Sequence, residues 1–234
     1  LLNIEPGEVV KKQRIHGLDQ IRGTGVLLMI IFHFSYDLRL HGLPSIDSDI
    51  RLFWHWLPRL IVFIFLFCVG CSLRIAHFPR MNWHSFIKRF CLISMYALII
   101  SIVTYILFPN RWVYFGTLHC IALCSLCGAL LVNYPRFSLL LSILIISPVI
   151  LFDFKYPWIN LGHGSMDYEP FLPWFYVTLL GIFVESTGLL RKFHISNFGG
   201  GNILSFLGKK ALIIYLTHQP ILFGLTFLLR KFSG

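Results

Sequence analysis

Apolar runs of membrane-spanning length alternate with shorter polar segments along most of the chain. Crossing about 30 Å of hydrocarbon takes roughly 20 helical residues, and seven runs reach or approach that length. These runs comprise residues 18–34, 57–73, 90–108, 113–132, 137–152, 170–190 and 211–229. The pattern predicts an all-α, polytopic membrane bundle of about seven transmembrane helices.

The composition agrees with this pattern. The 234 residues are 56% hydrophobic and only 13% charged, a larger apolar share than a soluble core buries. No repeat or low-complexity linker divides the sequence, so we expect one domain over 1–234 that begins with a cytoplasmic segment at 1–17. The longer loops are 35–56, 153–169 and 191–210; Gly199-Gly200-Gly201 in the last predicts a plain connector or a turn that phosphate approaches.

Positive charges gather on one side of the predicted spans. Because Lys and Arg near span ends are retained in the cytoplasm, we expect a cytoplasmic N-terminus and, with seven spans, an external C-terminus. The net charge of +10 then reflects topology and contact with the lipid bilayer rather than binding of nucleic acid. The residues on the cytoplasmic side are Lys11, Lys12, Arg14, Arg74, Arg80, Lys88, Arg89, Arg136, Arg191, Lys192, Lys209 and Lys210.

Arg22 and His33 bracket an uncharged, mostly apolar part of the first span. Eleven helical steps bring both side chains to one face, about 16 Å apart along the axis. This places a cation at the membrane surface and an ionisable ring inside the bilayer, where such groups are functional candidates. Asp37, one turn beyond His33, is expected either to orient the imidazole as a general base or to end the span in water.

Three histidines are predicted at overlapping depth on different spans. His33 and His218 lie about 16 Å and 12 Å above the cytoplasmic surface, and His119 lies about 10 Å below the outer one. Each alone is as well explained by packing, but together they favour a shared polar cavity. The six cysteines, two CxxC spacings among them, all fall in spans, so we interpret them as small apolar packing residues and expect no metal site.

Several short motifs resemble one known family. Residues 18–23 with His33, an arginine and a histidine separated by ten residues, resemble the first-helix signature of the transmembrane acyltransferases, among them the acyltransferase-3 proteins. Segments 67–73, 115–119, 167–174 and 214–220 resemble bacterial relatives of the heparan-alpha-glucosaminide N-acetyltransferase catalytic domain. The lysosomal relative carries asparagine in place of His33 and its catalytic histidine later, so His41 stays an alternative to His33.

The resemblance implies an acyltransferase of the bacterial inner membrane. Acyl-CoA, and acetyl-CoA in particular, is the expected cytoplasmic co-substrate, and a sugar or glycolipid amine or hydroxyl at the outer side is the expected acceptor. A homo-oligomer is compatible with apolar helices facing lipid. The expected donor-binding residues are Arg22, Arg74, Lys209 and Lys210; the catalytic ones are His33, Asp37 and His218; those of the cavity are His119, Tyr215, Gln219 and Asp167.

Two other classes remain open. A proton-coupled transporter would use His33, Asp37, His119 and Glu185 as a relay, and a membrane redox protein would use two histidines as haem ligands. The absence of repeated halves or paired broken helices in the sequence weakens the transporter interpretation.

Overall fold

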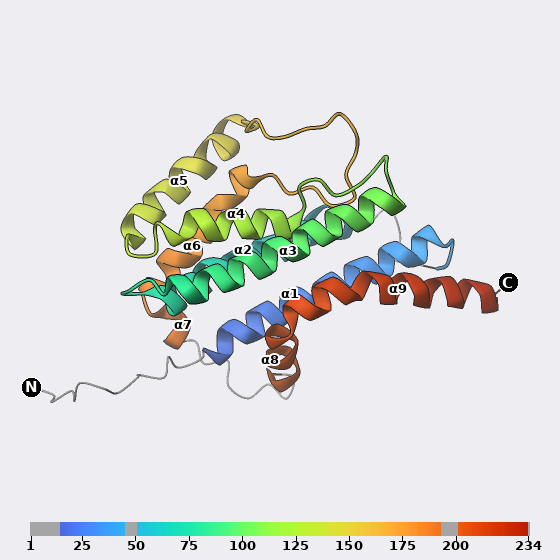
Figure 1. The fold of residues 1–234 in the computed structure, drawn as a ribbon, viewed down its shortest axis with the longest axis horizontal. Helices are drawn as coiled ribbons and strands as arrows, with labels where there is room; N and C mark the ends of the chain where they lie inside the picture. The colour runs from blue at the N-terminus through green and yellow to red at the C-terminus, as the bar shows by residue number, and fades with distance from the viewer. Residues whose placement is uncertain (1–14, 45–50, 193–200, 234) are drawn as a thin grey trace, which may run out of the picture.

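The computed structural model describes residues 15–44, 51–192 and 201–233, and these residues form helices joined by loops (Figure 1). In this part of the chain there is no β-strand, only an isolated bridge between Phe115 and Tyr168. The all-α prediction is confirmed. The helices are α1 (His16–Leu40), α2 (Arg51–His77), α3 (Trp83–Leu107), α4 (Thr117–Ala129), α5 (Pro135–Phe152), α6 (Phe171–Ser186), α7 (Leu189–Lys192), α8 (Gly201–Lys209) and α9 (Ala211–Ser233).

Five of the described helices are long and apolar enough to cross a membrane: α1, α2, α3, α5 and α9. The other two predicted spans are shorter helices, because α4 has 13 residues and α6 has 16, or about 20 Å and 24 Å. Residues 113–116 are not helical but run beside Tyr168, and Gly188, with φ of 71°, ends the turn after α6. The expectation of seven spans is therefore not confirmed.

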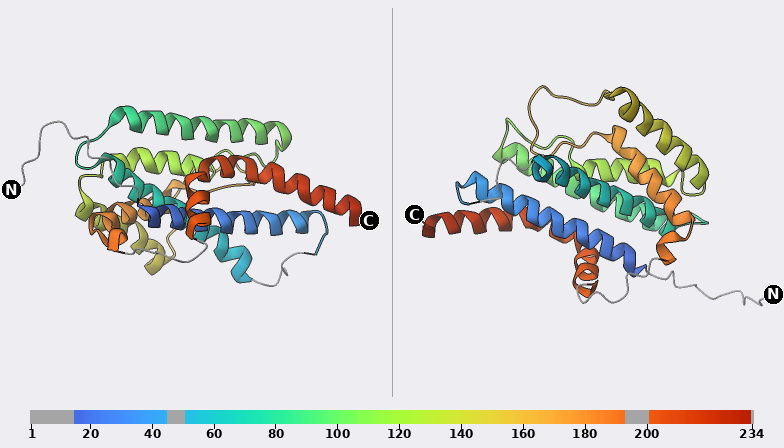
Figure 2. Two further views of the ribbon diagram at one scale, coloured as in Figure 1. Left: turned by 90° about the horizontal axis from the view of Figure 1, so that it is seen from below. Right: turned by 180° about the vertical axis from the view of Figure 1, so that it is seen from behind.

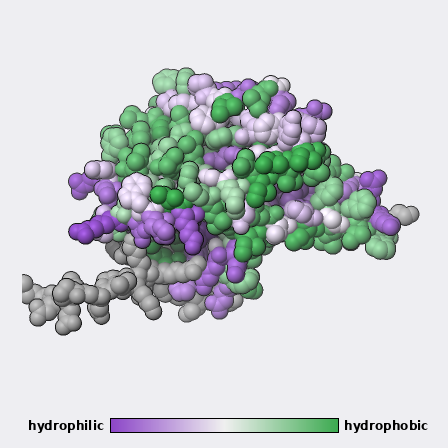
Figure 3. Space-filling view, in the orientation of Figure 1, coloured by the Kyte–Doolittle hydropathy of each residue, from purple (hydrophilic) through white to green (hydrophobic). Residues whose placement is uncertain are grey.

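The short helices lie at the centre of the bundle, where α6 packs against α2. A Cβ atom on Gly70 would lie 2.0 Å from the carbonyl oxygen of Thr178, and one on Gly181 would lie 2.4 Å from that of Phe67. Such close backbone contact at small residues is typical of helix packing in membranes. Apolar side chains cover much of the surface in Figure 3, whereas hydrophilic ones gather at the two ends, along the lower edge and at the upper right.

Two of the predicted loops are largely helical. The segment 35–56 continues α1 to Leu40 and begins α2 at Arg51, because the last turns of α1 pack against α9. The segment 191–210 contains α8, which lies across α1 (Figures 1 and 2). The connector interpretation was therefore wrong at Gly201, where α8 begins, whereas Gly199 and Gly200 lie outside the described residues.

Glycines also bring α8 onto α1. A Cβ atom on Gly208 would lie 1.9 Å from the carbonyl oxygen of Asp19, and one on Gly23 would lie 1.9 Å from that of Leu204. Only Lys210 separates α8 from α9, which then runs beside α1. The first and last predicted spans are thus neighbours, and their contact positions the residues described next.

Candidate active site

Two histidines from distant parts of the sequence meet between α1 and α9. The ring centroids of His33 and His218 lie 4.8 Å apart with an interplanar angle of 63°. His218 is buried, and its Nδ1 lies 2.7 Å from the carbonyl oxygen of Tyr215. Because a carbonyl only accepts, Nδ1 of His218 carries the proton and donates this hydrogen bond. The structure thus brings two of the three predicted cavity histidines into contact.

Asp37 is fully buried but does not bond to His33. Its Oδ1 accepts a hydrogen bond from Nε2 of Gln219, 3.0 Å away on α9. No hydrogen bond joins Asp37 to His33 among the described residues, so the expectation that Asp37 orients the His33 ring is not met. Because Asp37 is buried, it does not end the span in water either. Both possibilities treated α1 alone, whereas α9 supplies the actual partner.

His41, the alternative to His33, also contacts α9. Its Nδ1 lies 3.0 Å from Oγ1 of Thr226, and its ring lies 4.9 Å from that of Phe223. His41 is buried, with 8% of its surface exposed. These contacts fix the outer end of α1 on α9, and they engage one of the two ring nitrogens that a base would use.

Asp167 connects the outer loop to α4 and α9. Its carboxylate accepts hydrogen bonds from the backbone N–H of Thr117 at 2.8 Å, from Oγ1 of Thr117 at 3.0 Å and from the Tyr215 hydroxyl at 3.3 Å. Gly116 permits this approach, since a Cβ atom there would lie 2.3 Å from Oδ2 of Asp167. Burial raises the pKa of Asp167, whereas these hydrogen bonds lower it. The predicted cavity residues Asp167 and Tyr215 are therefore direct partners.

Glu169 lies in the same loop and was missed by the sequence analysis. Burial raises the pKa of Glu169 to about 8, and the Asp167 carboxylate acts in the same direction. The opposing influences are Arg59 and a hydrogen bond from Trp174. The sequence signal was the pair of acids two residues apart before an apolar run, but only the folded loop reveals that both are partly buried.

His119 has its own set of partners. Its Nδ1 accepts a hydrogen bond from the backbone N–H of Gly116 at 3.2 Å, and its Nε2 lies 3.1 Å from Oγ of Ser101 on α3. The Ser101 hydroxyl donates to the carbonyl oxygen of Val113. His119 therefore connects the start of α4 to α3. It does not contact the histidine pair directly: it influences the Asp167 carboxylate electrostatically, and Asp167 in turn accepts a hydrogen bond from Tyr215 on α9.

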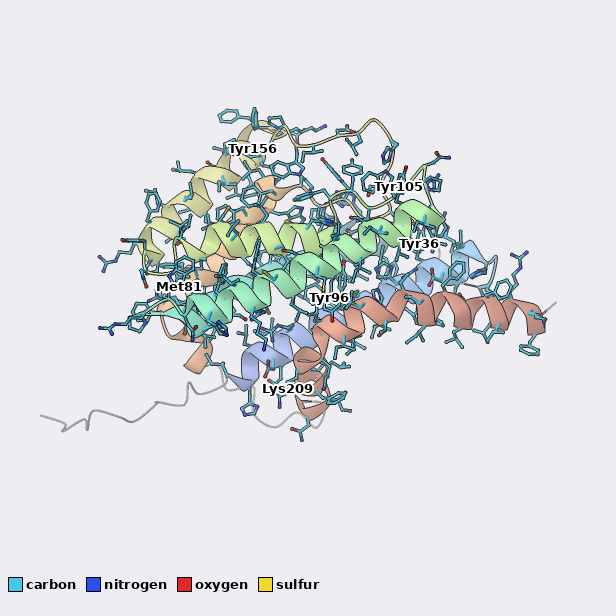
Figure 4. All side chains as sticks on the ribbon, viewed as in Figure 1. Tyr36, Met81, Tyr96, Tyr105, Tyr156 and Lys209 are labelled. Atoms are coloured by element: carbon cyan, nitrogen blue, oxygen red, sulfur yellow. The ribbon has the colours of Figure 1, made fainter. Side chains whose placement is uncertain are left out.

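The expected donor-binding cations differ in their surroundings. Arg22 lies 3.1 Å from Oδ1 of Asp19 and donates to Oγ of Ser72 at 2.8 Å. Lys209 and Lys210 are exposed where α8 meets α9 (Figure 4 labels Lys209). These three keep positions that a soluble anion can approach.

Arg74 is buried and therefore does not form part of the expected cationic surface. Its Nε lies 3.4 Å from Oε2 of Glu185, Nη1 donates to the carbonyl oxygen of Val132, and the guanidinium lies 4.0 Å from the Phe78 ring centroid. The sequence placed Arg74 correctly near the end of a span, but the pairing with Glu185 turns it inward. The same pairing separates Glu185 from the relay that a transporter would need.

A small, partly open crevice lies between α2, α3 and α4. Its polar lining comes from four side chains, whereas the rest of the lining is apolar. Ser72 also accepts the hydrogen bond from Arg22, so the crevice reaches α1. The sequence analysis did not identify this crevice, because its walls come from three helices. The lining residues are Val69, Ser72, Leu73, His77, Phe86, Arg89, Phe90, Ile93 and Ser125.

Comparison with known proteins identifies the family. The model of the catalytic domain of heparan-alpha-glucosaminide N-acetyltransferase matches residues 14–220. No curated protein and no solved structure gives a significant match. The matched region contains the histidine pair, the crevice and the Asp167 loop, and it covers far more than half of the sequence. The chain therefore belongs to the family of heparan-alpha-glucosaminide N-acetyltransferase catalytic domains, which indicates a membrane acyltransferase.

Proposed function

We propose that this protein transfers an acyl group, acetyl in the first instance, from cytoplasmic acyl-CoA to an amine or hydroxyl of a sugar or glycolipid at the outer side of the bacterial inner membrane. The observation that carries the proposal is the contact between His33 on α1 and His218 on α9 inside the helical bundle. Ionisable groups at such positions are costly, and a pair of imidazoles suits proton transfer.

The donor nucleotide is proposed to bind at the crevice between α2, α3 and α4. Arg89 in its lining and Arg22, through Ser72, supply positive charge for phosphate groups. Lys209 and Lys210 add exposed charge at the end of α8. Arg74 has no part in this proposal, since Glu185 and Val132 already occupy its guanidinium.

The thioester then has to reach the histidine pair. The distance of about 16 Å along α1 between Arg22 and His33 matches the order of length of a pantetheine arm. One imidazole removes the acceptor proton, which contributes about 10² to 10⁴ in rate. Orientation of thioester and acceptor in one site contributes further, because it makes the attack effectively unimolecular.

Aromatic rings near Asp167 support a sugar as the acceptor. The ring centroids of Trp112 and Tyr114 lie 5.9 Å apart, and those of Tyr114 and Tyr168 lie 5.5 Å apart. Tyr168 is 36% exposed, so this cluster offers an accessible face beside the loop that carries Asp167. Such faces suit the apolar side of a pyranose.

We place the protein in the membrane by the positive-inside rule, with its N-terminus and the crevice on the cytoplasmic side. The chain is proposed to act as one domain. The test uses purified full-length protein with radiolabelled acetyl-CoA and a bacterial glycolipid extract. We expect label in a glycolipid, and none with the double variant His33→Gln/His218→Gln. Absence of transfer together with absence of acetyl-CoA binding by the wild type would contradict the proposal.

A further inference from the structure

We infer that His218, through its Nε2 atom, takes the proton from the acceptor, and that Tyr215, Asp167 and Gln219 position it for this step. The inference rests on the proposed acyl transfer and divides the roles within the histidine pair. The sequence-based prediction had assigned the base to His33, and the experiment below distinguishes the two.

The tautomer of His218 is fixed by its own helix. Nδ1 donates to the carbonyl oxygen of Tyr215 at 2.7 Å, so Nε2 of the neutral ring carries a lone pair. That Nε2 atom is buried and has no hydrogen-bond partner among the described residues. A buried hydrogen-bond acceptor that receives no hydrogen bond costs free energy. The hydroxyl or amine of the substrate that receives the acyl group would donate the missing hydrogen bond to Nε2. The carbonyl thus holds the ring as a carboxylate does in many catalytic histidines.

His33 lacks such an orienting group. Neither of its ring nitrogens forms a hydrogen bond with a described residue, since Asp37 bonds to Gln219 instead. The two rings lie 4.8 Å apart, so protonation of one disfavours protonation of the other. The pair therefore takes up one proton at a time, and the preorganised ring is the better acceptor for it.

Residues on both sides of His218 hold α9 in place. Tyr215, one turn earlier, donates its hydroxyl to Asp167, which Thr117 holds through two hydrogen bonds. Gln219, the next residue, donates to Asp37 on α1. These bonds attach α9 to α4 and to α1 at the level of the imidazole. Asp167 and Gln219 are positioning residues, because they act on His218 through the helix.

The proposed step balances as follows. The acceptor oxygen or nitrogen forms a bond to the thioester carbonyl carbon while its proton passes to Nε2 of His218. The C–S bond then breaks, the thiolate of CoA leaves with the electron pair, and the imidazolium of His218 returns the proton to that sulfur. The products are the acylated acceptor and CoA, with no oxidant and no further reactant.

The tautomer is measured without any activity assay. In protein labelled with nitrogen-15 histidine, the resonances that disappear in His218→Gln belong to His218. We expect a protonated Nδ1 and an unprotonated Nε2 in the neutral wild-type ring. A protonated Nε2 would overturn the inference, whatever the outcome of the transfer assay, so its failure is distinguishable from failure of the proposed function.

Kinetics then separate the two histidines. With acetyl-CoA and the glycolipid that the wild type labels, His218→Gln should lower kcat by at least about 10²-fold and leave acetyl-CoA binding unchanged. His33→Gln should lower kcat by a smaller factor, and His84→Gln, at an exposed histidine in the first turn of α3, is the control that should stay near wild type. An equal or larger loss in His33→Gln would return the base to His33. Asp167→Asn should lower kcat while the acetyl-CoA KM holds, whereas a purely structural role would lower the folded yield alone.

Discussion

Asp37 lies one helical turn beyond His33, yet its carboxylate accepts its hydrogen bond from Gln219 of α9. The acid therefore joins the first and last long helices instead of orienting its neighbour on α1. This distinction predicts coupling between Asp37 and Gln219. Asp37→Ala and Gln219→Ala should each lower the unfolding temperature in detergent, and the double variant should lose less than the sum, with a coupling of about 0.5–3 kcal/mol. Additive losses would show that the two side chains act separately.

Arg89→Ala should weaken acetyl-CoA binding, because Arg89 lines the crevice assigned to the donor. A hydrogen bond to a charged group contributes about 1.5–3 kcal/mol, so Kd should rise roughly 10- to 150-fold. Isothermal calorimetry measures this change. Arg136→Ala is the matched control, since Arg136 is an exposed cation at the start of α5, away from the crevice. Equal weakening by both changes would indicate a general charge effect.

Arg74 and Glu185 form a buried pair, with 8% and 6% of their surfaces exposed. Arg74→Met leaves a buried carboxylate without its cation and should destabilise the protein by about 3–5 kcal/mol. The double variant Arg74→Met/Glu185→Leu should recover most of that loss, as measured by thermal unfolding. Without recovery, the arginine would contribute mainly through its contacts with Val132 and Phe78.

Gly208→Ala should separate α8 from α1, because the new Cβ atom would lie 1.9 Å from a backbone oxygen that has no freedom to move aside. Gly224→Ala is the control, since a Cβ atom there meets nothing within 4 Å and alanine favours a helix by about 0.5–1 kcal/mol. Thermal unfolding should show a loss for the first variant and no loss for the second. Two unchanged melting curves would contradict the close contact.

Glu169 predicts a stability that falls as pH rises. Its pKa is about 8 in the folded protein against an ordinary value of 4.5, so between these values the unfolded chain loses a proton that the folded protein keeps. As pH rises from 5 to 8, the unfolding temperature of the wild type should fall relative to that of Glu169→Gln, which carries no ionisable group at this position. A constant difference between the two over that range would mean that the Glu169 carboxyl is not perturbed by burial.

The sequence was sufficient for the elements that depend on local pattern. The lengths of the apolar runs located α1, α2, α3, α5 and α9, and the positions of His33 and His218 along their helices brought them to similar depth. Hydropathy alone did not distinguish α4 and α6, which have 13 and 16 residues, from the five longer helices, because a buried helix and a lipid-facing one are equally apolar.

The partners of the polar residues were less predictable. Asp37 was judged from its neighbour on α1 and Arg74 from its position at a span end, whereas their actual partners come from other helices. Glu169 was missed, because its surroundings depend on the fold of a loop. The crevice lined by Arg89 likewise requires the angle between α2 and α3, which no local pattern specifies. α8 was missed because its nine residues follow a glycine run that resembles a flexible connector.

Because the contact at Gly208 is fixed, the number of residues between Gly208 and His218 determines where the His218 side chain lies. Gly208 is held against α1, and only Lys210 joins α8 to α9, so chain length alone determines which way the following helix faces. One inserted residue would turn α9 by about 100° and carry His218 away from His33. In this interval the number of residues should therefore be constrained more strictly than their identity.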